Sequence, residues 1–192
     1  MPLTSRRIAF QPLILGAAFL LASTTLNAQG APRGVTQSGP IIQNGGMSAL
    51  VENADFAIPA GHVFKVMWEM NVGDTLVASP QLGIMARFYN LHARHGIPVE
   101  RLKAAGVFHG TGWWALLSDS AFAARFGGKK NPSRALVEEL VANGAQLVLC
   151  GQTAAFRGVK REELLPGVKL SISAMTALNV LGADGYRLNP WR

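Results

Sequence analysis

The single cysteine of this 192-residue sequence, Cys150, is the residue best suited to covalent chemistry. It ends the short apolar run 147–149, and Gly151 and a helix-like stretch that includes Gln152 and Thr153 follow at once. An unbroken apolar run is typical of a buried parallel strand, and ligands bind beyond the carboxyl ends of such strands. Backbone N–H groups at the start of the helix would stabilise a thiolate, which makes Cys150 a candidate nucleophile. The alternative is a small buried hydrophobic residue, because free cysteines are commonly buried.

Polar and aromatic side chains also follow the other predicted strands, at Asn71, Asp74, His109, Trp113 and Ser171 or Ser173. His109 is the expected partner of Cys150, because an imidazole can take the thiol proton or stabilise the thiolate. The alternative for His109 is a hydrogen bond within its own loop. Trp113, with Trp114, would form an apolar wall beside the sulfur, or else pack in the core or at an oligomer interface.

We therefore take Cys150 and His109 as candidate catalytic residues. The candidate substrate-binding residues are Gly151, Gln152, Thr153, Trp113 and Asn71. No metal site and no cofactor are expected. His92 and His95 have i,i+3 spacing on a predicted helix, but no further His, Cys or carboxylate supports them as ligands. The sequence has no glycine-rich phosphate loop after a strand and no Gly-x-Ser-x-Gly elbow.

Strand and helix patterns alternate along the chain. Strands are expected at 62–70, 102–109, 146–150, 168–172 and 186–188. Helices are expected from Ser79-Pro80 to Gly96, at 119–126 and 132–143, after Gly151, and at 174–181. The connections are long enough to be crossovers. The pattern therefore predicts a three-layer α/β/α sandwich with a mostly parallel five-stranded sheet, in one domain over residues 62–192.

The N-terminal residues have the composition of a targeting segment. Residues 1–28 combine Arg6 and Arg7, the apolar run 13–22 and the small-residue site 26–28, which predicts a cleaved signal peptide. We therefore expect a periplasmic or secreted protein with no membrane association after cleavage. Residues 29–61 should form a partly flexible arm, in which 41–51 packs on the body or on a neighbouring subunit.

The charge distribution argues against a nucleic-acid-binding role. The formal net charge is +7, but the basic residues are scattered, apart from Lys129-Lys130 and the group Arg157, Lys160 and Arg161. No basic run is interleaved with aromatic residues, so no nucleic-acid partner is expected. The group after Cys150 would attract an anionic substrate or form a solvated helix face.

From 62 to 190 the sequence resembles the DsrE/DsrF-like sulfur-relay family with the YchN-like fold, in particular its exported members. The resemblance rests on residues 106–110 (GVFHG), 143–145 (NGA), 150–152 (CGQ), 165–168 (LPGV), 177–179 (ALN) and 185–186 (GY). It implies a five-stranded parallel sheet and assembly as a homotrimer or homohexamer. It also implies a cysteine, here Cys150, that accepts sulfur as a persulfide and passes it on.

Two functional hypotheses follow. The first is an exported sulfur-relay protein that binds or transfers sulfane sulfur on Cys150, as a sulfurtransferase or carrier, with donor and acceptor proteins or small thiols as partners. The second is a non-catalytic oligomeric binding or assembly module in which Cys150 is structural.

Overall fold

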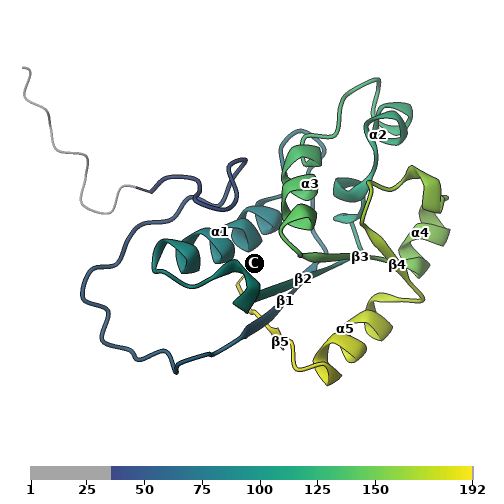
Figure 1. The fold of residues 1–192 in the computed structure, drawn as a ribbon. Helices are drawn as coiled ribbons and strands as arrows, with labels where there is room; N and C mark the ends of the chain where they lie inside the picture. The colour runs from purple at the N-terminus through teal and green to yellow at the C-terminus, as the bar shows by residue number, and fades with distance from the viewer. Residues whose placement is uncertain (1–35, 192) are drawn as a thin grey trace, which may run out of the picture. The chain divides into compact units, whose positions relative to one another are not determined.

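The computed structural model describes residues 36–191, and its centre is a five-stranded sheet in which all strand pairs are parallel. The strands lie in the order β4-β3-β2-β1-β5 (Figure 1). Their bounds are β1 Phe64–Met70, β2 Leu102–Phe108, β3 Gln146–Cys150, β4 Lys169–Ser171 and β5 Arg187–Leu188. The predicted parallel five-stranded sheet is confirmed, and the strand ends differ from prediction by one or two residues.

Helices cover both faces of this sheet, which gives the three predicted layers (Figure 1). Residues from four helices share the larger core cluster: α1 Pro80–Arg94, α2 Asp119–Arg125, α3 Arg134–Ala142 and α4 Gly151–Arg157. The other face is covered by α5, Ala174–Ala183, which packs in a smaller cluster. Three short 3₁₀ turns, Val99–Arg101, Trp113–Leu116 and Arg161–Glu163, were not predicted, because such turns have no distinctive hydrophobic period.

Side chains alternate between the two faces along each strand, and this alternation fixes where the residues at the strand ends point. Phe108 and Leu149 are register partners and both lie in the larger core cluster. Val107 and Val148 are also partners and both lie in the smaller cluster, against α5. A residue that follows Phe108 or Leu149 in extended conformation therefore belongs to the α5 face.

The segment before β1 packs on α1 through a buried carboxamide. Asn90, which is fully buried, accepts hydrogen bonds from the N–H groups of Ile41 and Ile42 and donates to the carbonyls of Ile42, Gly45 and Gly46. Ile42 is itself fully buried in the larger core cluster. The N-terminal end of this segment is thus attached to the domain rather than detached from it.

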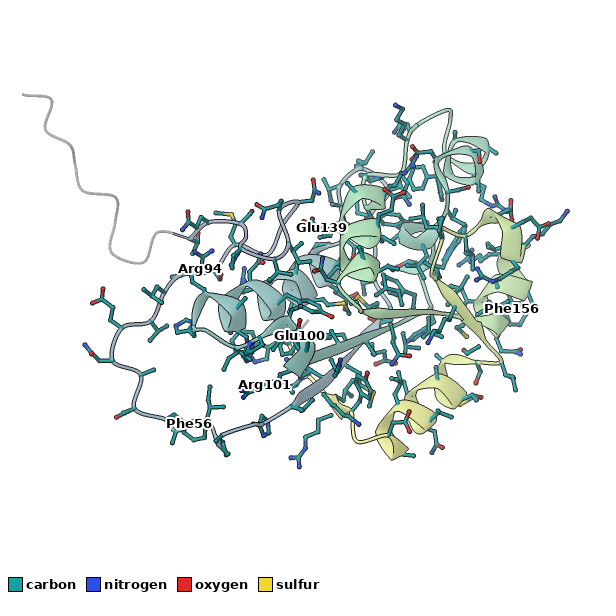
Figure 2. The ribbon with its side chains drawn as sticks, in the orientation of Figure 1. Phe56, Arg94, Glu100, Arg101, Glu139 and Phe156 are labelled. Atoms are coloured by element: carbon teal, nitrogen blue, oxygen red, sulfur yellow. The ribbon has the colours of Figure 1, made fainter. Side chains whose placement is uncertain are left out.

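Charged side chains reinforce this attachment on either side of Asn90. Glu139 of α3 accepts hydrogen bonds from the N–H groups of Gln43 and Asn44, and Arg94 of α1 donates to Ser48 Oγ (3.2 Å). Glu139 and Arg94 are labelled in Figure 2, each on the helix that borders the segment.

The predicted signal peptide, residues 1–28, and the first part of the predicted arm lie outside the described residues. Within residues 36–191, no helix combines the length and the apolar character needed to cross a membrane.

We predict that Asn90→Ala lowers the free energy of unfolding by about 3 kcal/mol, because it leaves several buried backbone groups without partners. Asn143→Ala is the matched control, since within residues 36–191 its carboxamide donates only to the Glu139 carbonyl near the end of α3, and should cost less than ~1 kcal/mol. Urea unfolding measures the free energy of unfolding of both variants. Equal losses in the two variants would contradict the role given to Asn90.

Candidate functional site

Cys150 lies where β3 passes directly into α4. It is the last residue of the strand and the N-cap of the helix, and its side chain is buried, with 5% exposed. Gly151 makes this direct passage possible, because a Cβ there would collide with the Ser171 carbonyl oxygen of β4. The backbone therefore approaches β4 more closely than any other residue type allows, and the first amides of α4 lie over the sulfur.

The surroundings of the sulfur are polar despite its burial. Burial raises the pKa of the Cys150 thiol. Hydrogen bonds from the N–H and hydroxyl of Thr153 and from the N–H groups of Ala174 and Gln152 lower it by more, so the pKa lies below its ordinary value. These donors come from α4 and from the first residue of α5. Gln152 and Thr153 thus lie beside the sulfur, as expected, and Ala174 is a contact that the sequence analysis missed.

His109 follows β2 at the level of Cys150. The β2–β3 pairing ends with Phe108 opposite Leu149. His109 and Cys150 are the residues that follow these two, so the alternation of side chains places both on the α5 face. No hydrogen bond joins the two side chains in the described part of the chain. The imidazole Nε2 lies 2.9 Å from Glu69 Oε1 on β1, which belongs to the same face, since its neighbours Trp68 and Met70 lie in the opposite cluster.

Glu69 is a site residue that sequence reasoning missed. The available signal was that Glu69 is the only carboxylate in the strand predicted at 62–70, two residues before Asn71. A carboxylate that accepts the Nε2–H of His109 orients the ring and leaves Nδ1 as the proton acceptor. The α5 face of the sheet therefore carries a carboxylate, an imidazole and a thiol on three neighbouring strands.

Asn71 and Trp113 lie around a different part of the carboxyl edge. Asn71 lines a hollow of about 390 Å³ with Gln81 and the 72–74 loop, and Trp113 lines a second hollow of about 450 Å³ with Asp74 and Arg157. Cys150 lines neither. Neither hollow therefore links Asn71 or Trp113 to the sulfur.

The two serines predicted at the fourth strand have local structural roles. Ser171 Oγ donates to the Ser173 carbonyl (2.7 Å), and Ser173 Oγ caps α5 by accepting from the Thr176 N–H (3.0 Å). The two hydroxyls therefore stabilise the turn from β4 into α5. This turn places the Ala174 N–H beside Cys150.

The described residues contain no cluster of three or more metal-ligating side chains. His92 of α1 and His95, which follows α1, are both hydrogen-bonded to carbonyls of that helix, His92 Nδ1 to Phe88 (2.7 Å) and His95 Nδ1 to Leu91 (2.6 Å). In addition, His95 Nε2 accepts from the Val51 N–H (2.9 Å).

We predict that Thr153→Val raises the pKa of Cys150, because the hydroxyl donor is lost while the backbone N–H remains. Thr153→Ser keeps the hydroxyl and is the control. The rate of alkylation by iodoacetamide as a function of pH measures this pKa in the folded protein. An unchanged midpoint in Thr153→Val, or an equal shift in Thr153→Ser, would contradict the assignment.

The sign of the accompanying stability effect follows from linkage. Because folding lowers the pKa of Cys150, the thiolate stabilises the folded state above the pKa of the unfolded chain. This contribution is lost as the pH falls through the folded pKa.

The solved structures of two other proteins are similar to this chain. One is a protein of unknown function, MTH1491, from Methanobacterium thermoautotrophicum, with 18% identity and a TM-score of 0.48, covering 66% of this chain and 97% of that one. The other is the ychN protein from E. coli, with 18% identity and a TM-score of 0.37, covering 66% of this chain and all of that one. No curated protein matches the sequence. The sequence model of the DsrE/DsrF-like family matches residues 79–190, more than half of the chain, and the protein therefore belongs to this family.

Proposed function

We propose that this protein binds and transfers sulfane sulfur as a persulfide on Cys150. The observation that carries the proposal is the buried thiol whose pKa is lowered by donors from Thr153, Gln152 and Ala174. A thiolate is the nucleophilic form of cysteine, and these donors hold it in place without a metal or a second thiol. Membership of the DsrE/DsrF-like family supports the same chemistry.

The transfer is a pair of thiol exchange steps with no net oxidation. The Cys150 thiolate attacks the terminal sulfur of a donor persulfide R–S–SH, so that a new S–S bond forms on Cys150 and the donor leaves as R–S⁻. An acceptor thiolate then attacks the outer sulfur, and Cys150 leaves as a thiolate. The donor and the acceptor are proteins or small thiols.

His109 would accept the proton in these steps, and Glu69 would orient the imidazole ring. With Nε2–H donated to Glu69, Nδ1 of His109 is free to accept the proton of a thiol or persulfide that approaches Cys150. His109 makes no hydrogen bond to the sulfur in the described structure, so this role requires the reacting group to lie between them.

The burial of Cys150 also favours the alternative of a non-catalytic assembly module with a structural cysteine. In that case the thiol would be protonated and unreactive, and Cys150→Ser would leave fold and assembly intact. The lowered pKa of the thiol favours the first function, because a purely structural cysteine does not require a stabilised thiolate.

We predict that the full chain gains the mass of one sulfur atom on Cys150 when exposed to a low-molecular-weight persulfide, and that Cys150→Ser does not. His109→Asn and Glu69→Gln should slow loading by at least about tenfold and change its pH profile. Mass spectrometry of the intact protein measures loading. The proposal fails if a control thiol protein is loaded and Cys150 is not.

We also propose that the chain assembles as a homotrimer or homohexamer through apolar side chains near the site. Phe156 of α4, Ile172 after β4 and Met175 of α5 are 87%, 75% and 79% exposed. They lie on α4, directly after β4 and on α5, and Phe156 is labelled on α4 in Figure 2. Exposed apolar side chains gathered in this way mark an interaction surface.

We predict that Phe156→Lys and Met175→Lys dissociate this assembly, because a charge cannot be buried without a partner. Phe56→Lys is the matched control, since Phe56 is 89% exposed on the segment before β1. Light scattering after size-exclusion chromatography gives the mass. A monomeric unmodified chain, or equal effects of the three variants, would contradict the proposal.

The predicted location remains part of the proposal. We infer export to the periplasm or secretion from the composition of residues 1–28, with no nucleic-acid partner and no membrane association after cleavage. In an oxidising compartment a solitary thiol has no internal disulfide partner and stays available for exchange.

A further inference from the structure

The hollow that contains Trp113 has the features of a small-molecule site separate from the thiol. It is an open hollow of about 450 Å³, a volume within the range of ligand pockets. Its lining comes from four parts of the chain: the loop 73–75 after β1, Thr111, Trp113 and Trp114 after β2, Phe126 after α2, and Arg157 at the end of α4. Cys150 is not part of the lining.

Close backbone packing holds one wall of this hollow in place. A Cβ at Gly73 would lie 2.7 Å from the Trp114 ring, and a Cβ at Gly112 would lie 2.5 Å from the Met70 carbonyl oxygen. Thr111 Oγ accepts from the Gly73 N–H (3.2 Å), and the Thr111 N–H donates to the Asn71 carbonyl (3.0 Å). The two loops therefore form a fixed unit rather than two independent segments.

Aromatic rings supply the apolar part of the lining. Trp113, Trp114 and Phe126 are largely buried, and Trp113 packs on Phe126 with ring centroids 6.1 Å apart. The faces and edges of such rings bind apolar groups and the sulfur of a thioether or thiol.

Two oppositely charged side chains line the same hollow and do not form an ion pair with each other. Asp74 and Arg157 both line it, yet neither forms an ion pair within residues 36–191, and the only hydrogen bond of the Asp74 carboxylate there is from the Leu76 N–H (2.8 Å). An anion alone would be repelled by Asp74, and a cation alone by Arg157. A ligand that carries both charges satisfies both residues.

We propose that this hollow binds a zwitterionic α-amino acid with an apolar or sulfur-bearing side chain. The ammonium group pairs with Asp74, the carboxylate pairs with Arg157, and the side chain lies against Trp113 and Trp114. This inference goes beyond the proposed sulfur transfer and does not rest on it, because it requires no reaction at Cys150.

Isothermal titration of the full chain tests this site with L-methionine, N-acetyl-L-methionine and L-methionine methyl ester. The last two lack the positive and the negative charge, respectively. We expect L-methionine to bind at least about fivefold more tightly than either blocked form, as suits partly solvated charge pairs. The titrations are repeated in Cys150→Ser, where the same affinities are expected, so the result is independent of the thiol.

Asp74→Asn should weaken the binding of L-methionine by about fivefold and should not weaken the binding of the N-acetyl form, whose carboxylate is no longer repelled. Arg157→Gln should weaken the binding of L-methionine similarly and should not weaken the binding of the methyl ester, whose ammonium group is no longer repelled. Both changes remove the charge and keep a polar side chain, and the carboxamide introduced by Asp74→Asn retains an oxygen that accepts from the Leu76 N–H. The controls are Asp55→Asn and Arg161→Gln, exposed residues outside the lining, which should have no effect.

Three results would overturn the proposal: no binding of L-methionine, equal binding of the blocked forms, or no effect of Asp74→Asn and Arg157→Gln.

Discussion

The direct passage from β3 into α4 is the constraint on which the candidate site depends. No residue separates the strand from the helix, and only glycine at position 151 lets the backbone pass Ser171 at this distance. The passage has two effects on Cys150. It buries the sulfur against the sheet, and it brings the N–H groups of Gln152 and Thr153 within reach of it. The first effect alone would raise the pKa of the thiol, and the second reverses that rise.

The strand register extends this local arrangement across the sheet. Since paired residues of parallel strands project from the same face, Glu69, His109 and Cys150 belong to the face that α5 covers. The loops after β1 and β2 line the two hollows. The carboxyl edge is therefore divided into a buried part with the thiol and an open part with aromatic rings and charges.

Much of this arrangement could be predicted from the sequence, because the relevant signals are local. The apolar run before Cys150 and the glycines and prolines that punctuate the chain give the strand and helix order, and parallel strands place their carboxyl ends at one edge. The position of Trp113 could not be predicted, because it depends on a buried 3₁₀ turn that has no periodic pattern. Glu69 was missed because a lone acidic residue in a strand is expected to face solvent until its neighbours on the next strand are known. The Ala174 contact is formed by a backbone amide, which every residue except proline has and no sequence pattern distinguishes.

The unequal cover of the two sheet faces bears on how a reagent reaches the sulfur. One face is covered by several helices over a large core. Within residues 36–191, α5 is the only helix on the other face, and it packs there in a small cluster that includes Ala177 and Leu181. Segments with few buried contacts open locally at a lower free-energy cost than the whole domain. We therefore expect a reagent to reach Cys150 by local displacement of α5. The same motion would withdraw the Ala174 amide, so the thiolate would be exposed and would lose one of its donors in one event.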